Sequence, residues 1–292
     1  MCLSPREALS ASPILGPPIL SFQASVCGSR SITWPSSLGI ARAAGFAATD
    51  LVLPEIAGES PCTIRSRLAA TRLLPGPASL PVEFRLDKDT FQRDLVQLPR
   101  LAALAAAVGI KTMFRALPAS GDVPAPELHL TLRSRISTIA TVLAANGIAF
   151  ALEPLGPLHR RREGRYEFIW RLADAAEFAS ACPDNVGLLL DAWHWHHSGA
   201  TIQEIIDAGK LIRHVHIADS ADLPPDRVRD DSRLLPGEGV VDLNGFFRGL
   251  SKAGYCGYVS PEVRGYSCKA SPTVCARAAY AASQTSLRAF GC

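Results

Sequence analysis

The most constraining feature of this sequence is a regular alternation of short apolar runs with segments of helical periodicity. Two helical segments, residues 91–108 and 132–143, keep apolar residues three or four positions apart. Such alternation predicts a parallel sheet, and eight units within 292 residues predict a single (β/α)8 TIM barrel of the α/β class. A doubly wound open sheet is the alternative, but the chain has no dinucleotide-binding or P-loop glycine motif. The expected strands cover residues 19–23, 49–53, 80–85, 110–116, 148–154, 187–191, 212–219 and 257–262.

Local signals indicate where several helices begin. Thr201 and Glu204 have the spacing of a capping box, and Asp242 is placed to cap the next helix. Ser271-Pro272 is a typical cap and first-turn pair for a last helix. Pro99 should kink or split the helix that contains it. The third expected strand is the least certain of the eight because prolines surround it.

Net charge, apolar run lengths and cysteine spacing limit the partners and the cellular location expected of this protein. A net charge of only +3 argues against nucleic acid as the main partner. No apolar run is long enough to cross a bilayer, and prolines interrupt the N-terminus where a signal peptide would need a continuous apolar segment. Eight scattered cysteines without a C-x-x-C pair are typical of reduced thiols, so we expect a cytoplasmic protein with no membrane partner. Residues 1–18 should form a flexible Pro-rich tail, and residues 19–292 the barrel.

The last four expected strands all end in metal-ligand residues: Glu153, Asp191, His216 and Glu262. Because parallel strands of a barrel end at one rim, these side chains should converge at the C-terminal ends of strands five to eight. Three crowded carboxylates would repel one another strongly unless a cation lies between them. The set suits one divalent metal ion, Mn²⁺, Mg²⁺, Co²⁺ or Zn²⁺. A buried network of ion pairs is the structural alternative.

The residues around Asp191 extend this predicted site. His194 follows within one helical turn, so we expect it to face the same cavity and contact substrate. Trp193 could form a wall of the pocket, with ordinary core packing as the alternative. Residues 196–197 are expected outside the site, on the surface. His214 has the strand parity of the predicted metal ligand at position 216, so it should point inward one layer deeper.

These motifs resemble the xylose isomerase-like TIM barrels, a family that includes sugar phosphate isomerases and epimerases, ketose 3-epimerases, hydroxypyruvate isomerase and inosose dehydratase. The likeness is clear from residue 111 to residue 263 and faint before it. The motifs are specific for the superfamily and not for one substrate. The matching segments are Leu152-Glu153-Pro154, Leu190-Asp191-Ala192-Trp193-His194, His214-Val215-His216-Ile217-Ala218-Asp219, Leu235-Pro236-Gly237-Glu238-Gly239 and Ser260-Pro261-Glu262.

The resemblance implies a metal-dependent isomerase or epimerase that acts on a sugar or keto-sugar through an enediolate, the substrate being a small-molecule carbohydrate. It implies that Glu153 and Glu262 are the acid/base pair as well as metal ligands, and that His194 binds a substrate oxygen. The alternatives are a metal-dependent dehydratase of the inosose or dehydroshikimate type and a non-catalytic sugar-binding barrel. Endonuclease IV shares the fold, but its three zinc ions need histidines from early strands, and the first histidine here is His129.

The chain departs from the ketose epimerases in the loop after the seventh strand. The family's arginine soon after the metal histidine is replaced here by residues 219–222, and arginine appears only at positions 227, 229 and 233. We predict Arg229 and Glu238 of this loop as substrate contacts. With the arginines at positions 160, 161, 162 and 165, the loop could attract a sugar phosphate or sugar acid, although a solvated loop is the alternative. The oligomeric state is open, and a homo-oligomer is compatible with the sequence.

Overall fold

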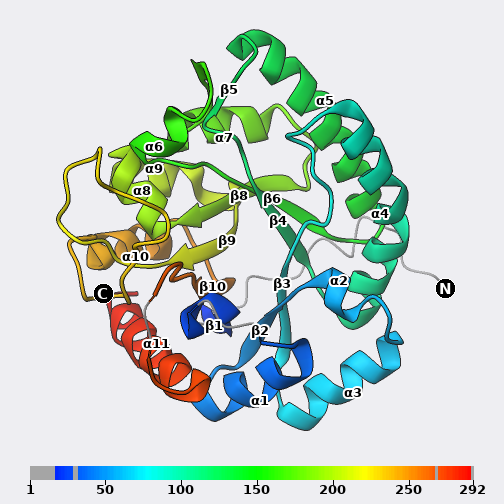
Figure 1. Cartoon of the computed structure of the whole chain (residues 1–292), viewed down its shortest axis with the longest axis vertical. Coiled ribbons are helices and arrows are strands. Elements are labelled where there is room, and N and C mark those ends of the chain that lie inside the picture. The colour runs from blue at the N-terminus through cyan, green and yellow to red at the C-terminus, as the bar shows by residue number, and fades with distance from the viewer. Residues whose placement is uncertain (1–16, 29–31, 267–268, 291–292) are drawn as a thin grey trace.

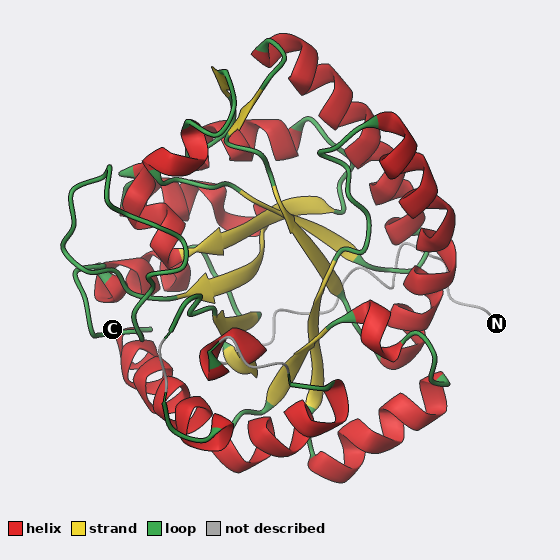
Figure 2. Ribbon diagram, in the orientation of Figure 1, coloured by secondary structure: helices red, strands yellow, loops and turns green. Residues whose placement is uncertain are grey.

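The computed structural model describes residues 17–28, 32–266 and 269–290. Eight parallel strands close into a barrel in the order β1-β10-β9-β8-β6-β4-β3-β2, and Figure 1 shows the helices surrounding them. Figure 2 shows the same arrangement, with the strands inside the ring of helices. The predicted (β/α)8 TIM barrel is therefore confirmed. The barrel strands are β1 (Ile19–Phe22), β2 (Ala48–Leu51), β3 (Leu74–Ser79), β4 (Thr112–Ala116), β6 (Ala149–Glu153), β8 (Val186–Asp191), β9 (Ile212–Ile217) and β10 (Tyr258–Pro261).

The outer helices each bury one apolar stripe against the barrel. In α4, for example, Phe91, Leu98, Ala105 and Val108 are buried at helical spacing. The described helices are α1 (Trp34–Ala44), α2 (Leu53–Ile56), α3 (Pro61–Thr71), α4 (Lys88–Val108), α5 (Ala125–Ala144), α6 (Leu158–Arg161), α7 (Leu172–Ser180), α8 (Ala192–Ser198), α9 (Ile202–Ala208), α10 (Leu243–Lys252) and α11 (Pro272–Ser286). Two short strands, β5 (Ser120–Gly121) and β7 (Tyr166–Glu167), form a separate antiparallel pair.

The third barrel strand differs from the prediction. It runs over Leu74–Ser79, whereas residues 80–85 follow it as a loop. The strand contains two prolines, which lack the N–H of a normal ladder and hide the pattern of a strand. Glycine at position 76 lets β3 pack closely against its neighbours, because a β-carbon there would collide with the side chain of Ser21 and the backbone of Thr49.

The predicted helix starts are confirmed for α9 and α10. Thr201 and Glu204 form a reciprocal capping box, and Asp242 accepts a hydrogen bond from the N–H of Gly245. The start of α11 at Pro272 is also confirmed. Pro99 does not split α4, which is one helix of 21 residues.

The ends of the chain and the cysteines are only partly described. Residues 1–16 of the predicted tail lie outside the described residues, and β1 begins at Ile19. Cys62, Cys182 and Cys256 are free thiols, but Cys275 is disulfide-bonded, so the cysteines are not all reduced as expected. Among the described helices, none has both the length and the hydropathy needed to cross a bilayer.

Candidate metal centre and active site

The four predicted ligands meet at one rim of the barrel. Glu153 ends β6, Asp191 ends β8, His216 lies in β9, and Glu262 directly follows β10. Asp191 and His216 are opposite each other in the β8–β9 register. One ligand atom from each of the four residues lies within 4.8 Å of all the others. All four side chains are buried, with exposures of 5% or less.

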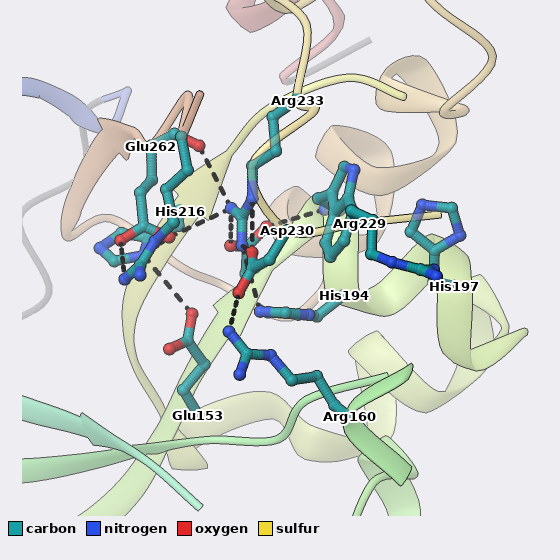
Figure 3. Close-up of polar contacts among 12 residues, drawn as sticks. Glu153, Arg160, His194, His197, His216, Arg229, Asp230, Arg233 and Glu262 are labelled. Atoms are coloured by element: carbon teal, nitrogen blue, oxygen red, sulfur yellow. Dashed lines mark hydrogen bonds and ion pairs between the residues drawn. The ribbon is translucent and has the colours of Figure 1, made fainter. Parts of the chain in front are cut away.

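Arg233 is the residue of this centre that the sequence did not reveal. Its guanidinium is fully buried and donates to Asp191 Oδ2 at 2.6 Å, lies 3.1 Å from Glu262 Oε2, and contacts His194 Nε2 at 3.2 Å. It also pairs with Asp230 at 2.6 Å, as Figure 3 shows. Arg233 therefore fixes the orientation of one candidate metal-ligand carboxylate and touches a second.

A buried carboxylate shapes the loop that carries Arg233. Asp219 is 1% exposed and accepts backbone hydrogen bonds from Ser220, Gly237 and Val241 at 2.8 to 2.9 Å. Its own backbone pairs with Leu234 in an isolated antiparallel bridge. This bridge holds the neighbouring Arg233 over the rim of the barrel.

Electrostatic coupling within the centre is strong. Burial lowers the pKa of His216, but the Glu262 and Glu153 carboxylates outweigh it and raise that pKa to about 10. Burial opposes ionisation of Glu262, yet the charges of His216 and Arg233 hold its pKa well below the usual value. Burial also opposes the charge of Arg233, but Asp191 and Glu262 raise its pKa further. The buried site thus stabilises the charged forms of His216, Glu262 and Arg233 against one another.

Several buried polar atoms of the centre have no hydrogen-bond partner within the described chain. They are Glu153 Oε1, Glu262 Oε2, and both ring nitrogens of His216. Leaving such atoms unpaired is unfavourable by about 1–3 kcal/mol each, more for charged groups. Arg233 and Arg264 each form an ion pair with Glu262, and Arg233 also pairs with Asp191, which leaves Glu153 without a guanidinium partner among the described residues. The three carboxylates and one imidazole, with their close spacing and unpaired atoms, therefore fit one divalent cation.

Two cavities open at this rim on either side of the centre. The first, of about 400 Å³, is lined by Glu262, Asp50 and Trp34, among others. The second, of about 380 Å³, is lined by Glu153 and His194. Ser79, Phe114 and Arg264 border both cavities. The two glutamates therefore face the same rim from different sides.

Of the predicted substrate contacts, only His194 lines a rim cavity. Trp193 is 1% exposed and lies beneath the Arg233 guanidinium at 4.6 Å, so it supports the site through packing. Arg229 is exposed and donates to the backbone carbonyls of Asp226 and Val228. Glu238 is exposed and accepts from the N–H of Leu235. The structure thus places Arg233, and not Arg229, at the centre.

The other histidines follow the prediction only in part. His196 and His197 were expected on a loop surface, but both are half-buried in the last turn of α8, and burial lowers the pKa of His197 to about 3. His197 packs beside Trp193 at 4.5 Å and contacts Ser220. His214 is fully buried, one layer below His216, with its ring centroid 4.7 Å away.

Comparison with known proteins places this architecture in a family. The model of the xylose isomerase-like TIM barrel family matches residues 38–289. The inosose isomerase of Bacillus subtilis is 40% identical over 81 residues, which cover 27% of this chain and 29% of that enzyme. The chain therefore aligns with less than a third of this curated relative.

Solved structures cover nearly the whole chain. A xylose isomerase domain protein of Alicyclobacillus acidocaldarius is 28% identical, with a TM-score of 0.83 over 93% of this chain and 98% of its own. The IOLI protein, solved with a bound zinc atom, is 20% identical, with a TM-score of 0.79 over 94% of this chain and 100% of its own. The family model matches most of the chain and the fold agrees, so the chain belongs to the xylose isomerase-like TIM barrel family.

Proposed function

We propose that this protein is a divalent-metal-dependent isomerase or epimerase of a sugar or keto-sugar. The observation that carries the proposal is the buried cluster of Glu153, Asp191, His216 and Glu262, whose ligand atoms lie within 4.8 Å of one another. The inosose isomerase similarity supports the reaction class, although it covers only part of either chain. Any of Mn²⁺, Mg²⁺, Co²⁺ or Zn²⁺ suits these ligands.

The two glutamates are suited to move a proton between the faces of a substrate. Glu153 approaches from β6 and Glu262 from the end of β10, and β8 and β9 lie between them in the barrel. One carboxylate removes the proton beside the substrate carbonyl, and the other returns a proton from the opposite side. His194, which lines the second cavity, is placed to bind a substrate oxygen. A bound metal ion would polarise the carbonyl and stabilise negative charge on its oxygen.

Arginines around the second cavity favour an acidic substrate such as a sugar phosphate or sugar acid. Arg85, Arg115, Arg160 and Arg264 all line this cavity, and Arg160 is paired there with Asp230 and Arg264 with Glu262. Arg85 and Arg115 share the single carboxylate of Glu83, whose pKa they lower to about 2 despite its burial. This pair therefore leaves one positive charge beside the cavity, which an anionic substrate group would neutralise.

Arg85→Gln should lower kcat/KM for a carboxylated or phosphorylated keto-sugar by about 10-fold or more, because the positive charge left over in the Arg85, Arg115 and Glu83 group is lost. Neutral keto-sugars should be affected much less. Arg161→Gln is the matched control, since Arg161 stacks on Trp170 at 4.1 Å and does not line this cavity. Equal losses for neutral and acidic substrates in Arg85→Gln would contradict an anion contact.

A dehydratase is the second candidate because it shares the opening proton abstraction at the same two glutamates. The test is a screen of keto-sugars, inososes and sugar acids with added Mn²⁺, followed by NMR in deuterium oxide. An isomerase or epimerase should place solvent deuterium on carbon and retain every oxygen of the substrate. A dehydratase should instead release water and yield a conjugated enone that absorbs in the ultraviolet. If no substrate exchanges a carbon-bound proton, and a chelator has no effect on any turnover, the proposed mechanism is wrong.

A further inference from the structure

The barrel interior contains a carboxylate that the proposed metal centre does not use. Asp50 lies in β2, and its Oδ1 accepts hydrogen bonds from Ser21 Oγ at 2.6 Å and Ser260 Oγ at 3.0 Å. Its other oxygen, Oδ2, is buried without a hydrogen-bond partner in the described chain. A buried carboxylate oxygen left unpaired is unfavourable, so Asp50 Oδ2 needs a donor.

The orientation of His216 shows which ring nitrogen faces the metal cluster. His216 Nδ1 lies 3.6 Å from Glu153 Oε1 and 3.7 Å from Glu262 Oε2. His216 Nε2 is also buried and has no hydrogen-bond partner among the described residues. Phe114 packs against the imidazole edge to face, with ring centroids 5.1 Å apart, and limits its rotation. The ring thus points Nδ1 at the ligands and leaves Nε2 for another group.

Asp50, His214 and His216 form a second close group. One ligand-type atom from each of the three residues lies within 4.8 Å of the others. His214 is unsuited to supply the missing donor. Its Nδ1 faces the carbonyl of Tyr258 at 3.2 Å, so Nδ1 carries the proton there. With the ring proton on Nδ1, the Nε2 of His214 carries the lone pair, and it faces Ser260 Oγ at 3.5 Å. The remaining N–H of this group belongs to His216.

We propose that Asp50 is a positioning residue that accepts a hydrogen bond from Nε2–H of His216, directly or through one water molecule. This bond fixes the tautomer in which the lone pair of Nδ1 points at the metal cluster. Histidine ligands in metal sites commonly donate their second N–H to a carboxylate in this way. Ser21 and Ser260 complete the arrangement by holding Asp50 Oδ1. The inference rests on the metal-binding part of the proposed function.

The wild-type protein provides the first test. With ¹⁵N-labelled histidine and Zn²⁺, long-range proton–nitrogen spectra should show His216 with a protonated Nε2 and a metal-bound Nδ1. The signal is assigned by its loss in His216→Asn. Zinc on Nε2, with the proton on Nδ1, would overturn the proposal. So would a second zinc ion held by Asp50 and His214.

The second test replaces Asp50 with asparagine. Because the two serine hydroxyls donate to the oxygen at the Oδ1 position, the amide should turn its NH₂ toward His216 and favour the wrong tautomer. The metal dissociation constant, measured by titration calorimetry with Zn²⁺, should rise about 10- to 100-fold. Glu55→Gln is the matched control, since Glu55 lines the same cavity from α2 and is exposed. Its metal affinity should equal that of the wild type.

These measurements separate the inference from the proposed function. If the wild type binds zinc but Asp50→Asn binds it equally well, Asp50 has no positioning role and the metal centre still stands. If the wild type binds no metal, both proposals fail. Circular dichroism and denaturant unfolding of the chelator-treated protein check that the Asp50→Asn variant folds. If it does not fold, the proton–nitrogen spectra of the wild type alone decide whether Nε2 of His216 carries the proton.

Discussion

Replacing Glu153 with glutamine should lower kcat by about 100-fold or more and weaken metal binding in the same protein. The amide cannot remove a substrate proton, and a positioned general base typically contributes about 10²–10⁴-fold in rate. Glu153 also has a buried oxygen with no hydrogen-bond partner in the part of the chain that the structure describes, so this oxygen is available to bind a cation. Both losses therefore follow from one substitution.

Two measurements check the Glu153→Gln result. Elemental analysis should find less metal in the variant than in the wild type, and deuterium exchange into substrate should be lost even at saturating metal. Glu163→Gln is the control, because the side chain of Glu163 is 56% exposed and pairs only with Arg160. If Glu153→Gln retains metal and turns over substrate like Glu163→Gln, Glu153 has neither role.

Arg233→Met should destabilise the chelator-treated protein by about 3–5 kcal/mol, the usual loss when one partner of a buried ion pair is removed. Arg233 is 2% exposed and contacts Asp191, Asp230 and Glu262. Without it, the carboxylates repel one another in a buried site. A divalent ion should relieve this repulsion, so added metal should raise the unfolding temperature more in the variant than in the wild type.

Denaturant unfolding with and without metal tests this second prediction. Arg229→Met is the matched control, because Arg229 is exposed and donates only to nearby backbone carbonyls. Its free energy of unfolding should change by about 0.5 kcal/mol or less. Equal stabilities for the two variants would show that Arg233 is not needed to balance the buried charges.

The convergence of the four candidate metal ligands could be predicted because two simple rules place them. Each is at or near the end of a strand with an apolar pattern, and parallel barrel strands end at one rim. Arg233 could not be placed in the same way, since three arginines lie in one long loop and strand periodicity does not extend into it. The signal that could have identified Arg233 is its position beside Leu234, which pairs with Asp219 shortly after β9.

The early part of the barrel was harder to predict because its strands lack a clear apolar pattern. The third strand contains two prolines and a glycine that packs against the backbone of β2, so its sequence is not typical of a strand. Asp50 was missed because the second strand was expected to run over residues 49–53, whereas it covers Ala48–Leu51. Only the contacts with Ser21 and Ser260 show that its carboxylate faces inward.

The measurement that most directly tests the central claim is the metal content of the wild-type protein. After purification without chelator, elemental analysis should find about one divalent ion per chain, as expected for a site with four protein ligands. Chelation should remove the ion, and a single equivalent of Mn²⁺ or Zn²⁺ should restore it. Protein that neither retains nor rebinds a divalent ion would contradict the assignment of Glu153, Asp191, His216 and Glu262 as a metal centre.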